Sequence, residues 1–220
     1  MRRDRPVILL TGFGPFPGAP RNASSLLIEE LAKRAPRRLP GFAVHAETLP
    51  TEWQAGPDRL SELLDEFDPV VALHFGVSHR ARGFVVETRA RNARQDVEDA
   101  CGAWPGELCI AGSGPAEVSA TLPTGLIVER LRRMGLPVQL SRDAGGYLCN
   151  AILYHSLSEA RLRDTGGLGP RRGFIHIPDR LSGGRAGGWR RASASLLDWE
   201  GALEGGLEIM TISAGVGSKD

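Results

Sequence analysis

Short apolar runs alternate with stretches of helical periodicity along the chain, and this alternation limits the possible folds more than any other feature. Runs that are apolar throughout are typical of strands buried on both faces of a sheet. Strands that alternate with helices predict parallel strands joined by helical crossovers. We therefore expect an α/β fold: a three-layer α/β/α sandwich around a mostly parallel, twisted sheet.

The predicted elements follow one another without an internal repeat or a long low-complexity tract. A chain of 220 residues that is 41% hydrophobic is long enough for one well-packed domain, which we expect to span residues 1–220. Strands are expected at 7–11, 42–47, 70–75, 83–89, 137–141 and 173–177, and helices at 23–34, 57–67, 122–134, 147–160 and 192–203.

In parallel sheets, binding sites gather where the chain leaves the carboxyl ends of the strands. Four segments are expected there, at residues 11–22, 76–82, 141–149 and 176–180. The long loop at 92–118 either covers the site or is a surface insertion, and the sequence leaves both readings open.

Composition excludes several classes of partner. The 27 basic and 26 acidic residues nearly cancel, so net charge favours neither a nucleic-acid nor a membrane partner. The apolar run within residues 1–10 is too short for a signal peptide or a membrane span. Three cysteines without framework spacing indicate a reducing, cytoplasmic setting. Cys101 and Cys109 have no neighbouring histidine, so we expect no metal site and no cofactor.

The opening loop, "LLTGFGPFPG" (residues 9–18), resembles a phosphate-binding loop only in its glycines. It lacks the lysine of a Walker loop. Its prolines also remove backbone donors that a pyrophosphate would need. The loop does offer two rings, Phe13 and Phe16, on a stiff turn. We expect them to form an apolar wall for a small, neutral, flat ligand, with nucleotide binding as the weaker alternative.

The segment "VQLSRDAGGYLCNAILYHSL" (residues 138–157) predicts a strand, a glycine turn and a helix that begins near Tyr147. Cys149 would then lie in the first helical turn. Free backbone N–H groups and the positive end of the helix dipole favour a thiolate there, and they could also stabilise an oxyanion. Cys149 is therefore a candidate nucleophile, although a buried core thiol would give the same pattern.

A thiol nucleophile usually needs a histidine partner. His176 is the best placed of the five histidines, because it ends a short apolar strand just before Pro178. Glu87 ends another apolar run and could orient the imidazole, unless it is merely an exposed strand-end acid. The other histidines are expected in the core, in a loop or off the face of Cys149: His45, His74, His79 and His155.

Taken together, these segments resemble pyroglutamyl peptidase I, a family of cytosolic cysteine peptidases that remove an amino-terminal pyroglutamate. The strongest match is "LPVQLSRDAGGYLCN" (residues 136–150). The motifs "TGFGPFPG", "LPTEW", "ALHFGVS", "LPTGLIVERLRRMGLP" and "GFIHIPD" occur in the family's order. The resemblance covers roughly residues 6–210 and implies a phosphorylase/hydrolase-like fold.

The resemblance implies a triad of Glu87, Cys149 and His176, in which Cys149 attacks the carbonyl after the pyroglutamyl ring. It also implies a substrate peptide with a blocked amino terminus and a homo-oligomeric assembly. The residues implied in substrate binding are Phe13, Phe16, Tyr147 and Leu148 as pocket walls, and Gly76 and Val77 through their backbone groups.

Some positions depart from the family's pattern. Val85 and Thr88 replace polar and basic residues on either side of Glu87, and His79 and Arg80 replace small residues near the pocket. Two alternatives therefore stay open beside pyroglutamyl hydrolysis. One is a divergent amidase for other small cyclic or acyl amides, and the other is a non-catalytic binder of such molecules.

Overall fold

The computed structural model describes residues 5–16, 20–163, 169–183 and 196–216. The strands are β1 (Val7–Phe13), β2 (Ala43–Leu49), β3 (Val71–Ser78), β4 (Phe84–Glu87), β5 (Arg89–Arg91), β6 (Glu117–Ser119), β7 (Val138–Ser141) and β8 (Arg171–Pro178). The helices are α1 (Ala23–Arg38), α2 (Ala55–Phe67), α3 (Thr124–Arg133), α4 (Leu148–Leu162) and α5 (Trp199–Ser213).

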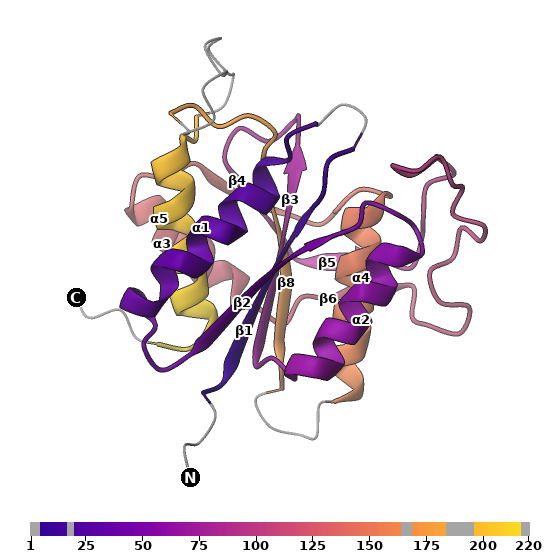
Figure 1. Ribbon diagram of the computed structural model, residues 1–220, viewed down its shortest axis with the longest axis horizontal. Helices are drawn as coiled ribbons and strands as arrows, with labels where there is room; N and C mark the ends of the chain where they lie inside the picture. Colours follow the sequence, from indigo (N-terminus) through magenta and orange to yellow (C-terminus); the bar gives the residue numbers. More distant parts are fainter. Residues whose placement is uncertain (1–4, 17–19, 164–168, 184–195, 217–220) are drawn as a thin grey trace.

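Six strands form one sheet in the order β2-β1-β3-β8-β4-β7, with helices on both faces. Helices α1, α3 and α5 cover one face, and α2 and α4 cover the other (Figure 1). Four of the five strand pairs are parallel, so the predicted three-layer, mostly parallel α/β fold is confirmed. None of the helices in the described ranges is long and apolar enough to cross a membrane.

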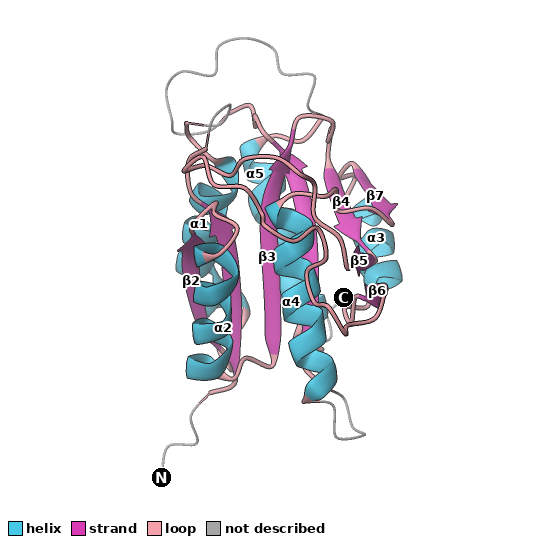
Figure 2. Ribbon diagram, turned by 90° about the vertical axis from the view of Figure 1, so that its right-hand side faces the viewer, coloured by secondary structure: helices cyan, strands magenta, loops and turns pink. Residues whose placement is uncertain are grey.

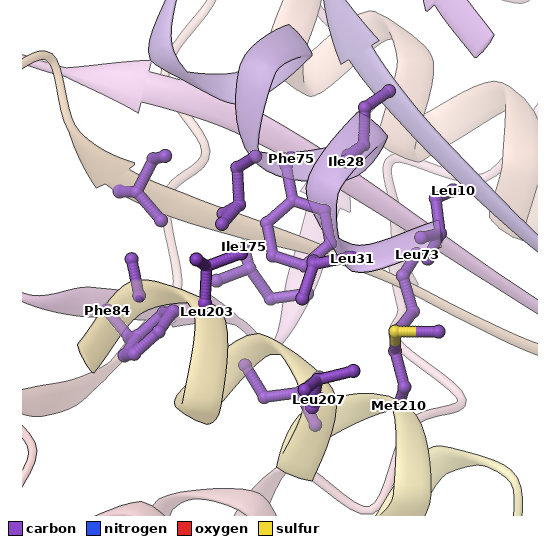
Figure 3. Packing of buried hydrophobic residues seen from close by; sticks show 14 of the residues in the cluster. Leu10, Ile28, Leu31, Leu73, Phe75, Phe84, Ile175, Leu203, Leu207 and Met210 are labelled. Atoms are coloured by element: carbon purple, nitrogen blue, oxygen red, sulfur yellow. The ribbon is translucent and has the colours of Figure 1, made fainter. Parts of the chain in front are cut away.

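Two apolar cores lie on the two faces of the sheet, because successive strand residues point to opposite sides. Leu10, Leu73 and Ile175 point toward α1 and α5 and pack there with Leu31 (Figure 3). The strand residues next to these in sequence point to the opposite face, toward α2 and α4; Phe174, next to Ile175, is one of them. This alternation places His176, two residues after Phe174, on the same face as helix α4.

Two strands run in a direction that differs from the sequence-based expectation. β4 pairs antiparallel with β8, and β7 pairs parallel with β4. These two strands therefore run opposite to the rest of the sheet. The prediction that segment 141–149 leaves the same sheet edge as 76–82 and 176–180 is therefore wrong. The turn after Ser141 instead leads to α4, which lies along β3 (Figure 2).

The last helix also differs from its predicted range. We expected residues 192–203, whereas α5 begins at Trp199 and ends at Ser213; residues 192–195 lie outside the described ranges. Asp198 caps the helix by accepting a 2.7 Å hydrogen bond from the Gly201 N–H. Gly205 and Gly206 lie inside this helix, where a Cβ would collide with Phe84 and Leu31, so the close packing of α5 against this core requires glycine.

A buried hydrogen-bonded chain ties α4 to the sheet. His74 of β3 is fully buried, and its ring nitrogens lie 2.8 Å from the hydroxyls of Thr11 and Ser156. Ser156 lies two helical turns after Cys149 on α4, and Gly76 lies two residues after His74 on β3. The contact between His74 and Ser156 therefore fixes the position of α4 along β3, and with it the place where Cys149 meets the sheet. It also fits the expectation of a satisfied core histidine.

We expect acid to destabilise the protein from a pH well above the carboxylate range. Burial, followed by the charge of Arg172, lowers the pKa of His74 from 6.5 to about 3. The unfolded chain then binds a proton that the folded chain refuses, so stability falls as the pH drops from 6.5 toward 3. The loss is about 1.4 kcal/mol per pH unit for this one group.

Urea unfolding at several pH values between 7.5 and 5 measures how steeply the free energy of unfolding falls with pH. His155, whose pKa burial also lowers, adds to it. A His74→Asn variant should be less stable at pH 7.5 and show a shallower slope. An unchanged slope in this variant would contradict the assignment to His74.

Candidate active site

His176 and Glu87 form a buried pair where β8 meets β4. The antiparallel register places Val85 opposite His176, and the two strands bring Nδ1 of His176 to 2.9 Å from Oε1 of Glu87. Only 8% of His176 and 1% of Glu87 is exposed. Glu87 is therefore not an exposed strand-end acid, and its carboxylate fixes the orientation of the imidazole ring.

Cys149 lies in the first turn of α4, as the glycine turn predicts. Tyr147 is the N-cap residue with extended backbone angles, and its side chain makes no capping hydrogen bond. Among the described residues, no hydrogen bond is recorded from the N–H groups of Leu148 and Cys149. The positive end of a 15-residue helix thus lies beside the thiol.

Cys149 meets the sheet at Gly76, the β3 residue paired with His176. A Cβ on Gly76 would be 3.1 Å from Sγ of Cys149 and 2.6 Å from Cζ of Phe174. The thiol of Cys149 is also close enough to the His176 side chain to raise the pKa of that imidazole. The glycine therefore makes the space in which the thiol reaches the imidazole.

The charge state of His176 depends on its two neighbours. Burial lowers its pKa, but the charge and hydrogen bond of the Cys149 thiolate, together with Glu87, outweigh burial and raise the pKa to about 10. These neighbours thus favour the protonated, imidazolium form of His176. What the raised pKa of His176 adds to stability is fully present below pH 6.5 and is lost as the pH rises toward 10.

A methyl group at Gly76 should separate the thiol from the imidazole. For Gly76→Ala we expect kcat to fall about 10-fold to 100-fold, because misplacement of about 1 Å is enough to slow a positioned reaction. Overpacking should also cost about 1–3 kcal/mol of stability. Gly125→Ala is the matched control, since a Cβ on that helical glycine meets nothing within 4 Å. Steady-state kinetics check both variants, and a Gly76→Ala enzyme with normal kcat would contradict this geometry.

Aromatic rings continue the site along the same face of the sheet. Phe13, at the end of β1, is 3% exposed, and its ring centroid lies 6.2 Å from that of Phe174. The Phe174 ring lies 4.8 Å from the His176 ring. Phe16, beyond the end of β1, and Val77, near the end of β3, are both half-buried. The structure thus brings Phe13 into one row with the Glu87–His176 pair.

The residues before the nucleophile line a second side of the site. Tyr147 is half-buried and packs edge-on against Trp53, with 5.1 Å between ring centroids. Leu148 is buried, and a Cβ on Gly56 of α2 would lie 3.7 Å from its Cδ1. His79 and Arg80 are exposed in the turn after β3.

Sequence reasoning missed two aromatic residues of the site, Phe174 and Trp53. Phe174 could have been found from strand periodicity, since it lies two residues before His176 and shares its face. Trp53 carries no such local signal, because its partner Tyr147 is far along the chain.

The 92–118 loop is anchored beside this wall. Asp99 accepts hydrogen bonds from the backbone N–H groups of Trp53, Cys101 and Ala103 at 2.9–3.0 Å. Burial raises the pKa of Asp99, but these hydrogen bonds and one from the Cys101 thiol lower it on balance. The Trp53 indole donates to the Val97 carbonyl at 2.9 Å. The loop therefore supports the ring that Tyr147 packs against.

Known proteins share both the sequence and the fold. The family described as pyroglutamyl peptidase matches residues 6–181. A pyrrolidone-carboxylate peptidase from Chromobacterium violaceum is 37% identical over 173 residues, 78% of this chain and 77% of that protein.

Two solved structures superpose over nearly the whole chain. Pyroglutamyl peptidase I from Bacillus amyloliquefaciens has a TM-score of 0.80 at 26% identity, covering 96% of this chain and 97% of the other. A variant of the Pyrococcus furiosus pyrrolidone carboxyl peptidase has a TM-score of 0.82 at 24% identity, covering 95% and 98%. With a family match over most of its length and relatives more than 30% identical, the chain belongs to the pyroglutamyl peptidase family of cysteine-type omega peptidases.

Proposed function

We propose that this pyroglutamyl peptidase hydrolyses the amide bond after an amino-terminal pyroglutamyl residue with Cys149, His176 and Glu87 as its catalytic triad. One observation carries the assignment. The 2.9 Å Glu87–His176 pair lies beside Gly76, against which the Cys149 thiol packs at the start of α4. Nucleophile, base and orienting acid are thus within reach of one another, which is the arrangement of an activated thiol.

In the acylation step, the Cys149 thiolate attacks the pyroglutamyl carbonyl carbon. The N–H groups of Leu148 and Cys149 stabilise the negative charge that develops on the carbonyl oxygen. The tetrahedral intermediate collapses when the C–N bond breaks, and protonated His176 gives its proton to the leaving amine. A thioester of pyroglutamate on Cys149 remains, and the shortened peptide leaves.

In the deacylation step, neutral His176 takes a proton from a water molecule that attacks the thioester. The C–S bond then breaks, which releases pyroglutamic acid and restores the thiolate and the imidazolium. Glu87 holds the ring orientation and supports the positive charge on His176 in both steps.

The pocket residues act on the lactam ring. Phe13, Phe16 and Tyr147 would flank its faces, with Leu148 as a further wall. Backbone groups of Gly76 and Val77 would pair with the ring amide. A flat, neutral five-membered lactam suits an apolar pocket with a few backbone hydrogen bonds.

A panel of naphthylamides tests the substrate assignment against its alternatives. We expect turnover of the pyroglutamyl amide and at least about 100-fold less for the prolyl and glutamyl amides, which lack the lactam amide or add charge. Preferred turnover of another cyclic amide would support the divergent amidase. Ligand binding without turnover by reduced wild-type protein would support the non-catalytic binder.

The substrate partner is a small peptide whose amino terminus is a pyroglutamyl group. We also propose a cytoplasmic location and a homo-oligomeric state. The location is supported by the three cysteines, all of which are free thiols. Light scattering of the purified protein measures the mass in solution and tests the oligomeric state.

A further inference from the structure

Two chain segments that carry catalytic groups are hydrogen-bonded along their length. The acid segment (residues 87–95) begins at the last residue of β4, and the nucleophile segment (residues 141–150) begins at the last residue of β7. Their contact begins where Glu87 pairs with Ser141. The backbone N–H and hydroxyl of Thr88 both donate to the Ser141 carbonyl, at 2.8 and 2.7 Å. The contact between the two segments ends where the Gln95 N–H donates to the Gly146 carbonyl at 2.7 Å.

Asn150 closes the middle of this contact. Its side-chain oxygen accepts from the Arg91 N–H at 2.9 Å, and its side-chain nitrogen donates to the carbonyls of Arg91 and Ala93 at 2.8 and 2.9 Å. Asn150 is 1% exposed. A side-chain amide has the donor and acceptor of a peptide group, so Asn150 bonds to β5 as a neighbouring strand residue would.

Arg91 of β5 also contacts the turn that precedes α4. The Arg91 guanidinium donates to the Asp143 carboxylate at 2.7 Å, and Asp143 in turn accepts from the Gly145 N–H at 3.1 Å. Arg91 and Asp143 are exposed, so this ion pair adds little to stability by itself. The buried Asn150 contacts are the ones that fix the first turn of α4 against β5.

We infer that Asn150 is a positioning residue for the reaction. It holds the turn that carries Cys149, and the free N–H groups of Leu148 and Cys149, at a fixed place relative to the segment that begins at Glu87. This inference rests on the proposed role of Cys149. Loss of the clamp should slow the chemical step more than substrate binding, because the proposed lactam contacts of Phe13, Gly76 and Val77 lie on other strands.

Asn150→Ser and Asn150→Asp remove the two donated hydrogen bonds, the second variant with an added charge. We expect kcat to fall about 10-fold to 100-fold in both, while KM changes by less than about threefold. The rate of Cys149 alkylation by iodoacetamide should also reach half its maximum at a higher pH, since the helix N–H groups no longer face the thiolate. A merely structural clamp would not change that pH.

Asn92 offers a matched control on the same segment. Its side-chain oxygen accepts from the Ala111 N–H at 2.8 Å, and its nitrogen donates to the carbonyls of Ala111 and Gly114 at 2.7 and 3.3 Å. This clamp has the same chemistry as that of Asn150 but anchors the distal part of the 92–118 loop. Asn92→Ser should lose stability and keep kcat and the alkylation profile near wild type.

The outcomes separate this inference from the proposed function. An inactive wild type, or an active Cys149→Ser, would overturn the triad itself. An active wild type with unaltered kcat and alkylation profile in folded Asn150→Ser would overturn only the role of Asn150. Equal kinetic losses in the Asn150 and Asn92 variants, or failure of both Asn150 variants to fold by circular dichroism, would assign Asn150 a structural role instead.

Discussion

Replacing Cys149 by serine should lower kcat on a pyroglutamyl amide by at least about 10⁴-fold, the largest effect we expect of any substitution in this chain. Serine keeps the size of the side chain, but its hydroxyl stays protonated where a thiol yields a thiolate beside His176. KM should change little, because the lactam contacts lie on other residues. Steady-state kinetics with stability measured in parallel check the prediction.

The other thiols of the chain serve as controls for this substitution. Cys101 is exposed and Cys109 is half-buried, and both lie in the 92–118 loop. Cys101→Ser and Cys109→Ser should keep kcat within about twofold of wild type, as surface changes away from a site usually do. A loss of kcat in either control comparable to that of Cys149→Ser would contradict the assignment of Cys149 as the nucleophile.

Glu87→Gln should give the second-largest loss, with kcat lower by about 10²–10⁴-fold, because glutamine neither fixes the tautomer of His176 nor supports its positive charge. The variant should also have a narrower pH profile. Glu87 is one of the groups that raise the pKa of His176 toward about 10, so its loss lowers that pKa. The alkaline limb of kcat/KM, where His176 loses its proton, should move to lower pH.

Glu208→Gln is the control for loss of a buried acid. Glu208 of α5 is 2% exposed and accepts hydrogen bonds from Arg38 at 2.7 Å and Arg130 at 2.9 Å on the opposite face of the sheet. Its replacement should cost stability but leave kcat and the pH profile unchanged. If Glu87→Gln keeps the wild-type alkaline limb, then Glu87 does not set the charge of His176.

Local patterns predicted the layers of the fold and one end of the site. Strand and helix periodicities are local, so they were enough for the three layers and for the placement of Cys149 in the first turn of α4. The same period of two would have revealed Phe174 beside His176. Family resemblance added the pairing of Glu87 with His176, which the 2.9 Å contact supports.

Features that depend on distant parts of the chain could not be predicted in this way. The reversed direction of β4 is a property of the whole sheet, yet it is what brings Glu87 beside His176. The requirement for glycine at Gly205 and Gly206 of α5 depends on Phe84 and Leu31 on other elements. The Asn150 clamp joins residues 59 positions apart, and no local spacing indicates it.

Covalent labelling tests the central claim, that Cys149 attacks the pyroglutamyl carbonyl. A chloromethyl ketone of pyroglutamate carries the ring into the pocket and alkylates the thiol that meets its carbonyl group. Peptide mass spectrometry should find one label per chain on the peptide that contains Cys149, with activity lost in proportion to labelling. Label on Cys101 or Cys109 alone, or full activity in protein whose Cys149 is labelled, would contradict the account.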